Sequence, residues 1–192
     1  LEFRRVLFRS NPVYGYGKNF NPCIDCHAFM FRVAKELLPK YNASFIITGE
    51  VLGQRPMSQR GDALRLVGKL ANDIDEKLIL RPMSAKLMEP TTPELKGWVN
   101  RENLLDISGR GRDRQLTLAK KFEWEDYESP GGGCLLTDPY YSQKIKEHIK
   151  FDKFDTDDIE VLKFGRHFRL PDGAKLIVGR DEEDNNSLKN IK

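Results

Sequence analysis

The chain has 192 residues, and its 32 Lys and Arg against 29 Asp and Glu leave a formal net charge of only +3. This near balance excludes a gross polycation, and a hydrophobic fraction of 39% with 15 Gly and 10 Pro excludes collagen-like, low-complexity and wholly disordered chains. No apolar run approaches the roughly 20 residues of a membrane-spanning helix, so we expect no membrane partner. The length predicts one large domain or two small ones.

The cysteine count points to a cellular compartment. Three cysteines, Cys23, Cys26 and Cys134, are an odd number spread over a long chain. This does not suit a secreted disulfide scaffold, so we expect a reducing, cytoplasmic environment.

The first ten residues, LEFRRVLFRS, are basic and apolar without helical or strand periodicity. Arginines interrupt the apolar stretch at Arg4, Arg5 and Arg9, which argues against a signal peptide. We interpret residues 1–10 as a non-native scar, and the chain as a fragment that ends within a polar run.

Apolar periodicity predicts the elements of the first part of the chain. Helical spacing indicates helices over 27–38, 63–74 and 113–122, and Thr91 opens a further one with capping residues. The inward residues expected of the three longer helices are Met30, Ala34, Leu37, Leu38, Leu66, Val67, Leu70, Ile74, Leu116, Ala119 and Phe122. Apolar runs at 44–48 and 77–80 predict strands, the first of them buried and parallel. Strand, helix, strand indicates an α/β sheet.

The sequence changes character near residue 150. A helix opened by Asp138 and Pro139, with Tyr141, Ile145 and Ile149 at helical spacing, ends the first domain, which we place at 11–149. A small α+β unit is expected over 150–192. Its predicted elements are a short helix over 155–162 and two strands over 164–170 and 175–178, joined by the turn Pro171-Asp172-Gly173.

Cys23 and Cys26 form a CxxC pair at the start of a predicted helix, where backbone N–H groups stabilise thiolates. One such pair fits a redox site, half of a zinc site or two ligands of an iron–sulfur cluster. Cys134 follows a Pro-Gly-Gly-Gly run. Three thiolates suit a 4Fe-4S cluster that keeps one iron free, whereas structural zinc would need a fourth ligand, for which His27 is available. Three incidental cysteines are the remaining interpretation.

A polar loop follows the first predicted strand, at the position where open α/β sheets bind ligands. It contains Thr48, Gly49, Glu50 and Gln54. Glycines permit close backbone approach, and the neutral polar groups can bind a ligand. No complete phosphate loop of the GxxxxGK[ST] or GxGxxG kind is present in the sequence.

These motifs together resemble a known family. Ile47-Thr48-Gly49-Glu50, Leu52-Gly53-Gln54, Ser58-Gln59 and Leu80-Arg81-Pro82-Met83, with the CxxCH and Gly133-Cys134 motifs, are similar to the ATP-pyrophosphatase domain of tRNA 4-thiouridine synthetases, whose wider family includes the tRNA 2-thiouridine synthetases. The resemblance covers about residues 11–142. It implies the downstream part of a doubly wound parallel sheet, whose phosphate loop would precede residue 11.

The resemblance also implies chemistry. Thr48, Gly49, Glu50 and Gln54 would bind ATP with Mg, and Cys23, Cys26 and Cys134 would hold the cluster. A uridine carbonyl oxygen would be adenylated before a sulfur species displaces AMP. Because the 4-thiouridine enzymes use a persulfide-carrying cysteine, Cys134 is alternatively a catalytic sulfur carrier. Glu50 and Gln54 are alternatively loop caps.

The segment from Phe164 to Arg180 interleaves basic and aromatic residues on a predicted hairpin, the mixture that phosphate contacts and base stacking need. Its Asp-Gly turn and Ile177-Val178-Gly179-Arg180 end resemble the NFACT RNA-binding module. The candidate RNA-binding residues are Arg166, His167, Arg169, Lys175 and Arg180. Strand alternation places Arg166 and Phe168 on one face, with His167 and Arg169 on the other. Alternatively, Phe164 and Phe168 are core residues.

Together these features predict a tRNA-modifying enzyme that transfers sulfur to a uridine in an ATP-dependent reaction, with tRNA and a sulfur donor as partners. Without the phosphate loop, the present chain is expected to bind ATP poorly. The main alternative is a non-catalytic RNA-binding protein with a degenerate nucleotide fold and a structural metal, such as zinc. An adenylating enzyme for a small molecule is the third hypothesis.

Overall fold

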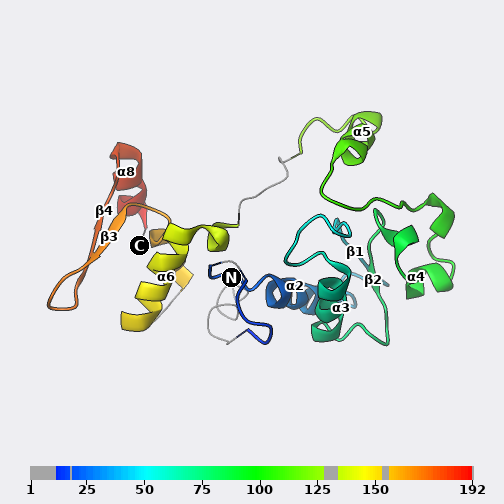
Figure 1. Ribbon diagram of the computed structural model, residues 1–192, viewed down its shortest axis with the longest axis horizontal. Helices are drawn as coiled ribbons and strands as arrows, with labels where there is room; N and C mark the ends of the chain where they lie inside the picture. Colours follow the sequence, from blue (N-terminus) through cyan, green and yellow to red (C-terminus); the bar gives the residue numbers. More distant parts are fainter. Residues whose placement is uncertain (1–11, 18, 128–133, 153–155, 192) are drawn as a thin grey trace. The chain divides into compact units, whose positions relative to one another are not determined.

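The computed structural model describes residues 12–17, 19–127, 134–152 and 156–191. The predicted scar at 1–10 and the glycine run at 131–133 lie outside these ranges. The chain divides into two compact units, and Figure 1 labels the main helices and strands along it. We call Pro22–Ser129 the α/β unit, and Leu1–Asn21 together with Pro130–Lys192 the hairpin unit. Each is described by itself.

The α/β unit has a strand–helix–strand arrangement. Strand β1 pairs in parallel with β2, with Ile46 opposite Ile79 and Ile47 opposite Leu80. This confirms the predicted parallel pairing. The predicted burial of the first strand was wrong, since Ile47 is 64% exposed. The described elements are α2 (Cys23–Leu37), β1 (Ile46–Ile47), α3 (Gly61–Leu70), β2 (Ile79–Leu80), α4 (Thr92–Leu95) and α5 (Asp113–Lys121), with 3-10 turns η1 (Ala85–Leu87) and η2 (Arg101–Asn103).

Helices α2 and α3 lie side by side (Figure 1) and enclose the core of this unit with β2. The buried core residues are Ala28, Phe31, Val67, Ala71 and Ile79. The core face of α2 was therefore predicted wrongly, since Met30 and Leu37 are 40% and 38% exposed.

Helix α3 ends four residues earlier than predicted. Asn72 adopts a left-handed conformation with φ of 55°, which stops the helix. The Asp73 carboxylate then accepts hydrogen bonds from the backbone N–H groups of Leu78 and Ile79, at 2.9 and 3.2 Å. Ile74 is consequently 55% exposed instead of buried.

Helix α5 forms as predicted but buries only Ala119. Leu116 and Phe122, which were expected to face inward, are exposed. Leu116 lines an open hollow with Trp124 and Tyr127, so its side of the helix faces solvent.

The hairpin unit contains η3 (Leu135–Thr137), α6 (Pro139–Phe151), α7 (Thr156–Val161), β3 (Arg166–Arg169), β4 (Lys175–Val178) and α8 (Glu182–Asn190). Strands β3 and β4 pair antiparallel, with Arg166 opposite Val178 and Arg169 opposite Lys175. The predicted turn is confirmed. Gly173 has a φ of 90°, and its N–H donates to the Leu170 carbonyl at 2.9 Å.

The core of the hairpin unit joins α6 to α7. Its buried residues are Phe20, Tyr141, Ile145 and Leu162. Helix α6 therefore packs with the C-terminal elements, and this compact unit is larger than the segment 150–192. The domain limits 11–149 and 150–192 stay predictions.

At the level of fold class, the chain is a mixed α/β protein that is mostly helical, with a two-stranded parallel sheet and a C-terminal antiparallel hairpin followed by a helix. Across the described ranges, no helix is both long and apolar enough to cross a membrane.

Candidate nucleic-acid interface

The hairpin has two different faces. Along β3 and β4 the side chains alternate between exposed and partly buried, as the period of a strand requires. We call Arg166, Phe168, Leu176 and Val178 the outer face, and His167, Arg169, Lys175 and Ile177 the inner face. The predicted sharing of faces by Arg166 with Phe168, and by His167 with Arg169, is confirmed.

The inner face is tied to α6 by ion pairs. Arg169 Nε donates to Glu147 Oε1 at 2.7 Å, and the same guanidinium pairs with Asp152. Lys175 Nζ donates to Glu147 Oε2 at 3.0 Å. The side chains of Arg169 and Lys175 are only 16% and 13% exposed. We interpret these two predicted RNA-binding residues as anchors of the hairpin, because RNA phosphates would have to displace their carboxylate partners.

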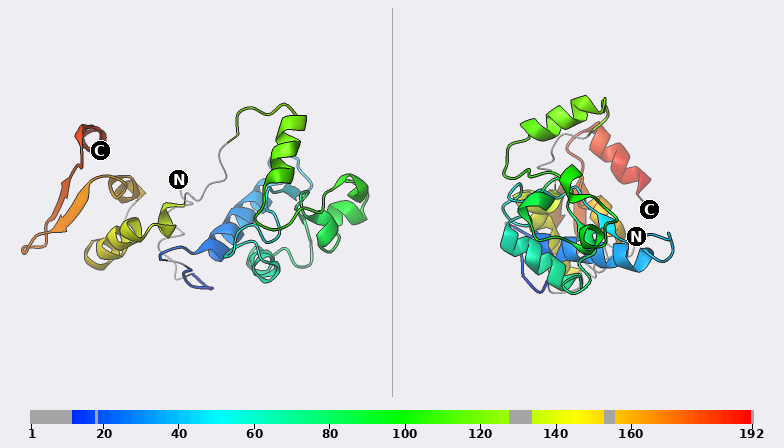
Figure 2. Two further views of the ribbon diagram at one scale, coloured as in Figure 1. Left: turned by 45° about the horizontal axis from the view of Figure 1, so that its top comes forward. Right: turned by 90° about the vertical axis from the view of Figure 1, so that its right-hand side faces the viewer.

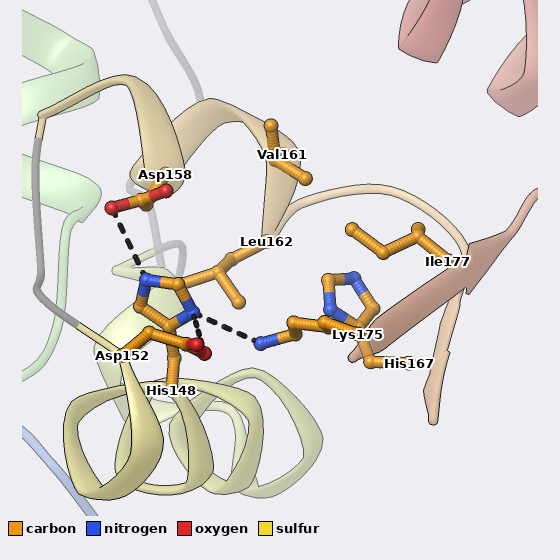
Figure 3. Close-up of a pocket in the computed structure, with 8 residues that line it drawn as sticks. All are labelled: His148, Asp152, Asp158, Val161, Leu162, His167, Lys175 and Ile177. Atoms are coloured by element: carbon orange, nitrogen blue, oxygen red, sulfur yellow. Dashed lines mark hydrogen bonds and ion pairs between the residues drawn. The ribbon is translucent and has the colours of Figure 1, made fainter. Parts of the chain in front are cut away.

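A pocket of about 300 Å³ lies between α6, α7 and the inner face (Figure 3). The His148 ring lines this pocket. Its Nδ1 is 3.1 Å from both Asp152 Oδ2 and Lys175 Nζ, and its Nε2 is 3.1 Å from Asp158 Oδ2. This network connects helix α6 to helix α7 and to strand β4.

His167 also lines this pocket. Its Nε2 is 2.9 Å from the Phe164 carbonyl oxygen, so this nitrogen carries the proton and donates it. Burial lowers the pKa of His167 to about 4, with a smaller effect of the nearby Lys144 and Lys175 charges. His167 is therefore neutral at pH 7 and offers no positive charge to a phosphate.

Arg180 belongs to a clasp at the end of the hairpin opposite its turn, where α8 lies (Figure 1 and Figure 2). We define the clasp as Gly165, Arg180 and Asp184. Asp184 Oδ2 accepts hydrogen bonds from the backbone N–H groups of Gly165 and Arg180 at 3.0 and 3.1 Å, and from Arg180 Nε at 2.6 Å. The Arg180 side chain holds the pKa of Asp184 well below its usual range.

The outer face is exposed and carries one cation among three apolar side chains. Arg166 is exposed, and within the described ranges its side chain makes no ion pair or hydrogen bond. Phe168, Leu176 and Val178 are 48%, 46% and 44% exposed. Between Phe164 and Arg180 the sequence has one acidic residue, Asp172 in the turn. Of the five predicted RNA-binding residues, Arg166 is thus the one that offers its charge to solvent without a partner in the described structure.

In the α/β unit, Glu50 and Arg81 meet at the carboxyl ends of β1 and β2. Glu50 is 5% exposed and accepts a hydrogen bond from Arg81 Nε at 2.9 Å. Its second carboxylate oxygen lies 2.7 Å from His27 Nδ1. Both oxygens of Glu50 are thus bound within the protein, and the sequence analysis missed both partners. The position of Arg81 directly after the second predicted strand was a signal for the Glu50 pairing.

Several buried polar atoms around this edge have no hydrogen-bond partner among the described residues. They are Gln54 Nε2, Ser58 Oγ, Gln59 Oε1 and Arg81 Nη2. Thr48 and Gly49 lead into this loop from β1, where the Thr48 N–H donates to the Leu80 carbonyl at 3.0 Å. Because unpaired buried polar atoms are costly, these atoms suit contact with a polar ligand.

Within the described ranges, none of the three cysteines forms a disulfide. Cys23 and Cys26 are half-buried in the first turns of α2, which begins four residues earlier than predicted. Cys134 is exposed and lies in the hairpin unit. Among the residues that the structure describes, no three His, Cys, Asp or Glu side chains are grouped to hold a metal ion. A cluster on all three thiols stays a prediction.

Comparison with known protein families gives a match at the C-terminal end of the chain. The sequence model of a family described as the NFACT protein RNA binding domain matches residues 165–192. This segment contains the hairpin, the clasp and α8. No curated protein and no solved structure matches the chain.

Proposed function

We propose that this chain binds RNA through the outer face of the β3–β4 hairpin, with Arg166 as its main phosphate contact. The match of residues 165–192 to an RNA-binding family suggests RNA binding in general. The exposed and unpaired guanidinium of Arg166 is the observation that carries the finer statement, because the other cations of the hairpin are already bound to carboxylates.

The geometry favours an affinity for RNA that is modest and sensitive to salt. One exposed guanidinium can neutralise a phosphate and release its counterions, so binding should weaken as salt rises. The inner face contributes by holding the strands in place. Glu147 binds both Arg169 and Lys175, and this fixes the register in which Arg166 stands beside Phe168.

The test is binding of the full chain to a fluorescent tRNA transcript, followed by anisotropy at low and at physiological salt. Arg166→Ala should weaken binding by about 1 kcal/mol and reduce the salt slope by about one. Lys146→Ala is the matched control, since it removes an exposed positive charge from α6, which packs against the inner face. Equal losses for the two variants would overturn the proposed role of the outer face.

A finer proposal concerns the α/β unit, as the ATP-binding part of a tRNA sulfur-transfer enzyme with a doubly wound sheet. The parallel β1–β2 pair supports it, together with the buried atoms of Gln54 and Arg81 that lack partners at the carboxyl edge. Amide and guanidinium N–H donors fit the phosphate or base acceptors of a nucleotide. When bound, ATP would supply the activation of a uridine oxygen for replacement by sulfur.

In this proposal Glu50 positions Arg81 and does not itself contact the nucleotide. In a longer protein that includes the phosphate loop, the Gln54→Ala variant should weaken binding of ATP with Mg, measured by isothermal titration calorimetry. Arg60→Ala, which removes an exposed cation paired with Asp62, is the control and should leave ATP affinity unchanged. Unchanged ATP affinity in Gln54→Ala would make Gln54 a loop cap.

A further inference from the structure

We infer that Phe168 is a stacking platform for an unpaired RNA base, so that the outer face prefers single-stranded over duplex RNA. This inference rests on the RNA binding proposed above and names the form of RNA that the hairpin recognises.

The Phe168 ring is exposed and uncovered. It lies within β3, opposite Leu176, and is 48% exposed. Within the described ranges it has no aromatic neighbour and no cation over its ring. Phe151 on α6 is a useful contrast, because its ring is 56% exposed but has Lys150 Nζ at 4.9 Å and Arg169 Cζ at 5.1 Å from its centroid. Of these two rings, only that of Phe168 has no described cation competing with a base for its face.

The surroundings of Phe168 fit a nucleotide. Arg166 lies two residues away on the same face, about 7 Å along the strand, so one nucleotide or two adjacent ones can reach both residues. Leu176 and Val178 lie opposite these two residues on β4 and form an aliphatic floor beside the ring. No acidic residue of β3 or β4 opposes the phosphate.

The same features disfavour duplex RNA. In an A-form helix the base faces are covered by their neighbours, and a protein reaches mainly phosphates and 2′-hydroxyls. A phenyl ring and two aliphatic side chains gain little against such a surface. An unpaired base has a free π-face, and stacking on an aromatic side chain is favourable for any base.

The test compares the full chain with a single-stranded oligoribonucleotide that carries one 2-aminopurine, and with the duplex of the same sequence. The wild-type chain should bind the single strand more tightly and quench the 2-aminopurine fluorescence. Phe168→Leu keeps an apolar side chain but loses the ring, so single-strand affinity should fall at least about five-fold and the quenching should disappear. Phe168→Trp should keep both, and Phe151→Leu should change neither.

The possible failures are distinguishable. If Phe168→Leu binds the single strand as tightly as wild type while Arg166→Ala binds more weakly, the stacking inference is overturned and the proposed function stands. If the wild-type chain binds the duplex more tightly than the single strand, the stacking inference is likewise overturned and the proposed function stands. If instead the chain self-associates and Phe168→Leu makes it monomeric without a change in RNA affinity, the outer face is a contact between copies. If the chain binds neither RNA, the proposed function itself is wrong.

Discussion

Gly165 and Asp184, 19 residues apart, are joined by a hydrogen bond in which the Gly165 N–H donates to Asp184 Oδ2 at 3.0 Å. Gly165 has a φ of 62°, and a Cβ there would stand 2.5 Å from the Val178 carbonyl oxygen. The start of β3 is therefore fastened to α8 at a position that requires glycine.

The carboxylate of Asp184 should stabilise the hairpin unit in a pH-dependent way. Its pKa is lowered in the folded protein, so its contribution is present above the ordinary carboxyl pKa of about 4 and is lost as the pH falls below it. Asp184→Asn should therefore lower Tm at pH 7, and its difference from wild type should shrink towards pH 3. Thermal unfolding followed by circular dichroism checks this. Glu183→Gln, at an exposed site on α8, is the control and should keep the wild-type Tm.

His167 should add a pH dependence at higher pH. Its pKa is lowered to about 4 from an ordinary value of about 6.5, so between these values the unfolded chain binds a proton that the folded chain does not. Stability should consequently fall as the pH is lowered from about 6.5 to 4. His167→Gln should flatten the dependence of the unfolding free energy on pH in this window. The unfolding free energy is measured by urea titration at several pH values. If its dependence on pH in His167→Gln equals that of the wild type, the ring is not neutral and buried as described.

Two isoleucines of α6 should respond differently to truncation. Ile145 is fully buried between Tyr141 and Leu162, whereas Ile149 is 40% exposed. Ile145→Ala should destabilise the hairpin unit by about 2–5 kcal/mol, because it leaves a cavity. Ile149→Ala should lower the free energy of unfolding by clearly less. Equilibrium urea unfolding measures both, and equal losses would mean that α6 does not pack as described.

The predicted iron–sulfur cluster can be tested by measuring the metal content of the protein. Protein purified without oxygen should contain iron and acid-labile sulfide, and Cys23→Ala, Cys26→Ala or Cys134→Ala should each remove most of it. Loss of a ligand should also lower stability, because thiolates bind metal only when folding brings them together. Zinc in place of iron would favour the structural-metal alternative, and full iron content in Cys134→Ala would exclude that residue as a ligand.

The parts of the fold that depend on local pattern could be predicted. The β3–β4 hairpin follows from alternation around a Pro-Asp-Gly turn, and the parallel β1–β2 pair follows from two apolar runs separated by a helix. The errors came from non-local effects. Nothing in the apolar spacing of 63–74 reveals that Asn72 turns left-handed and that Asp73 caps the next strand.

The candidate site was predictable only in part. Alternation correctly placed Arg166 beside Phe168, but residue type alone could not separate free cations from paired ones. Arg169 differs from Arg166 because Glu147 on α6 and Asp152 directly after α6 reach it across 22 and 17 residues. Likewise, the sequence pattern alone could not show that the Glu50 carboxylate is paired with His27 and Arg81.

Helix α6 precedes the segment that matches the RNA-binding family, yet it supplies the carboxylate that neutralises Arg169 and Lys175. A peptide excised from residue 150 onward would carry both cations without Glu147 and would expose Ile177 to water. Because acidic residues offset its Lys and Arg, such a peptide is not a polycation. It should instead lose the packing and ion pairs that hold Arg166 beside Phe168. The segment that matches the RNA-binding family thus depends on a preceding helix for the support of its hairpin.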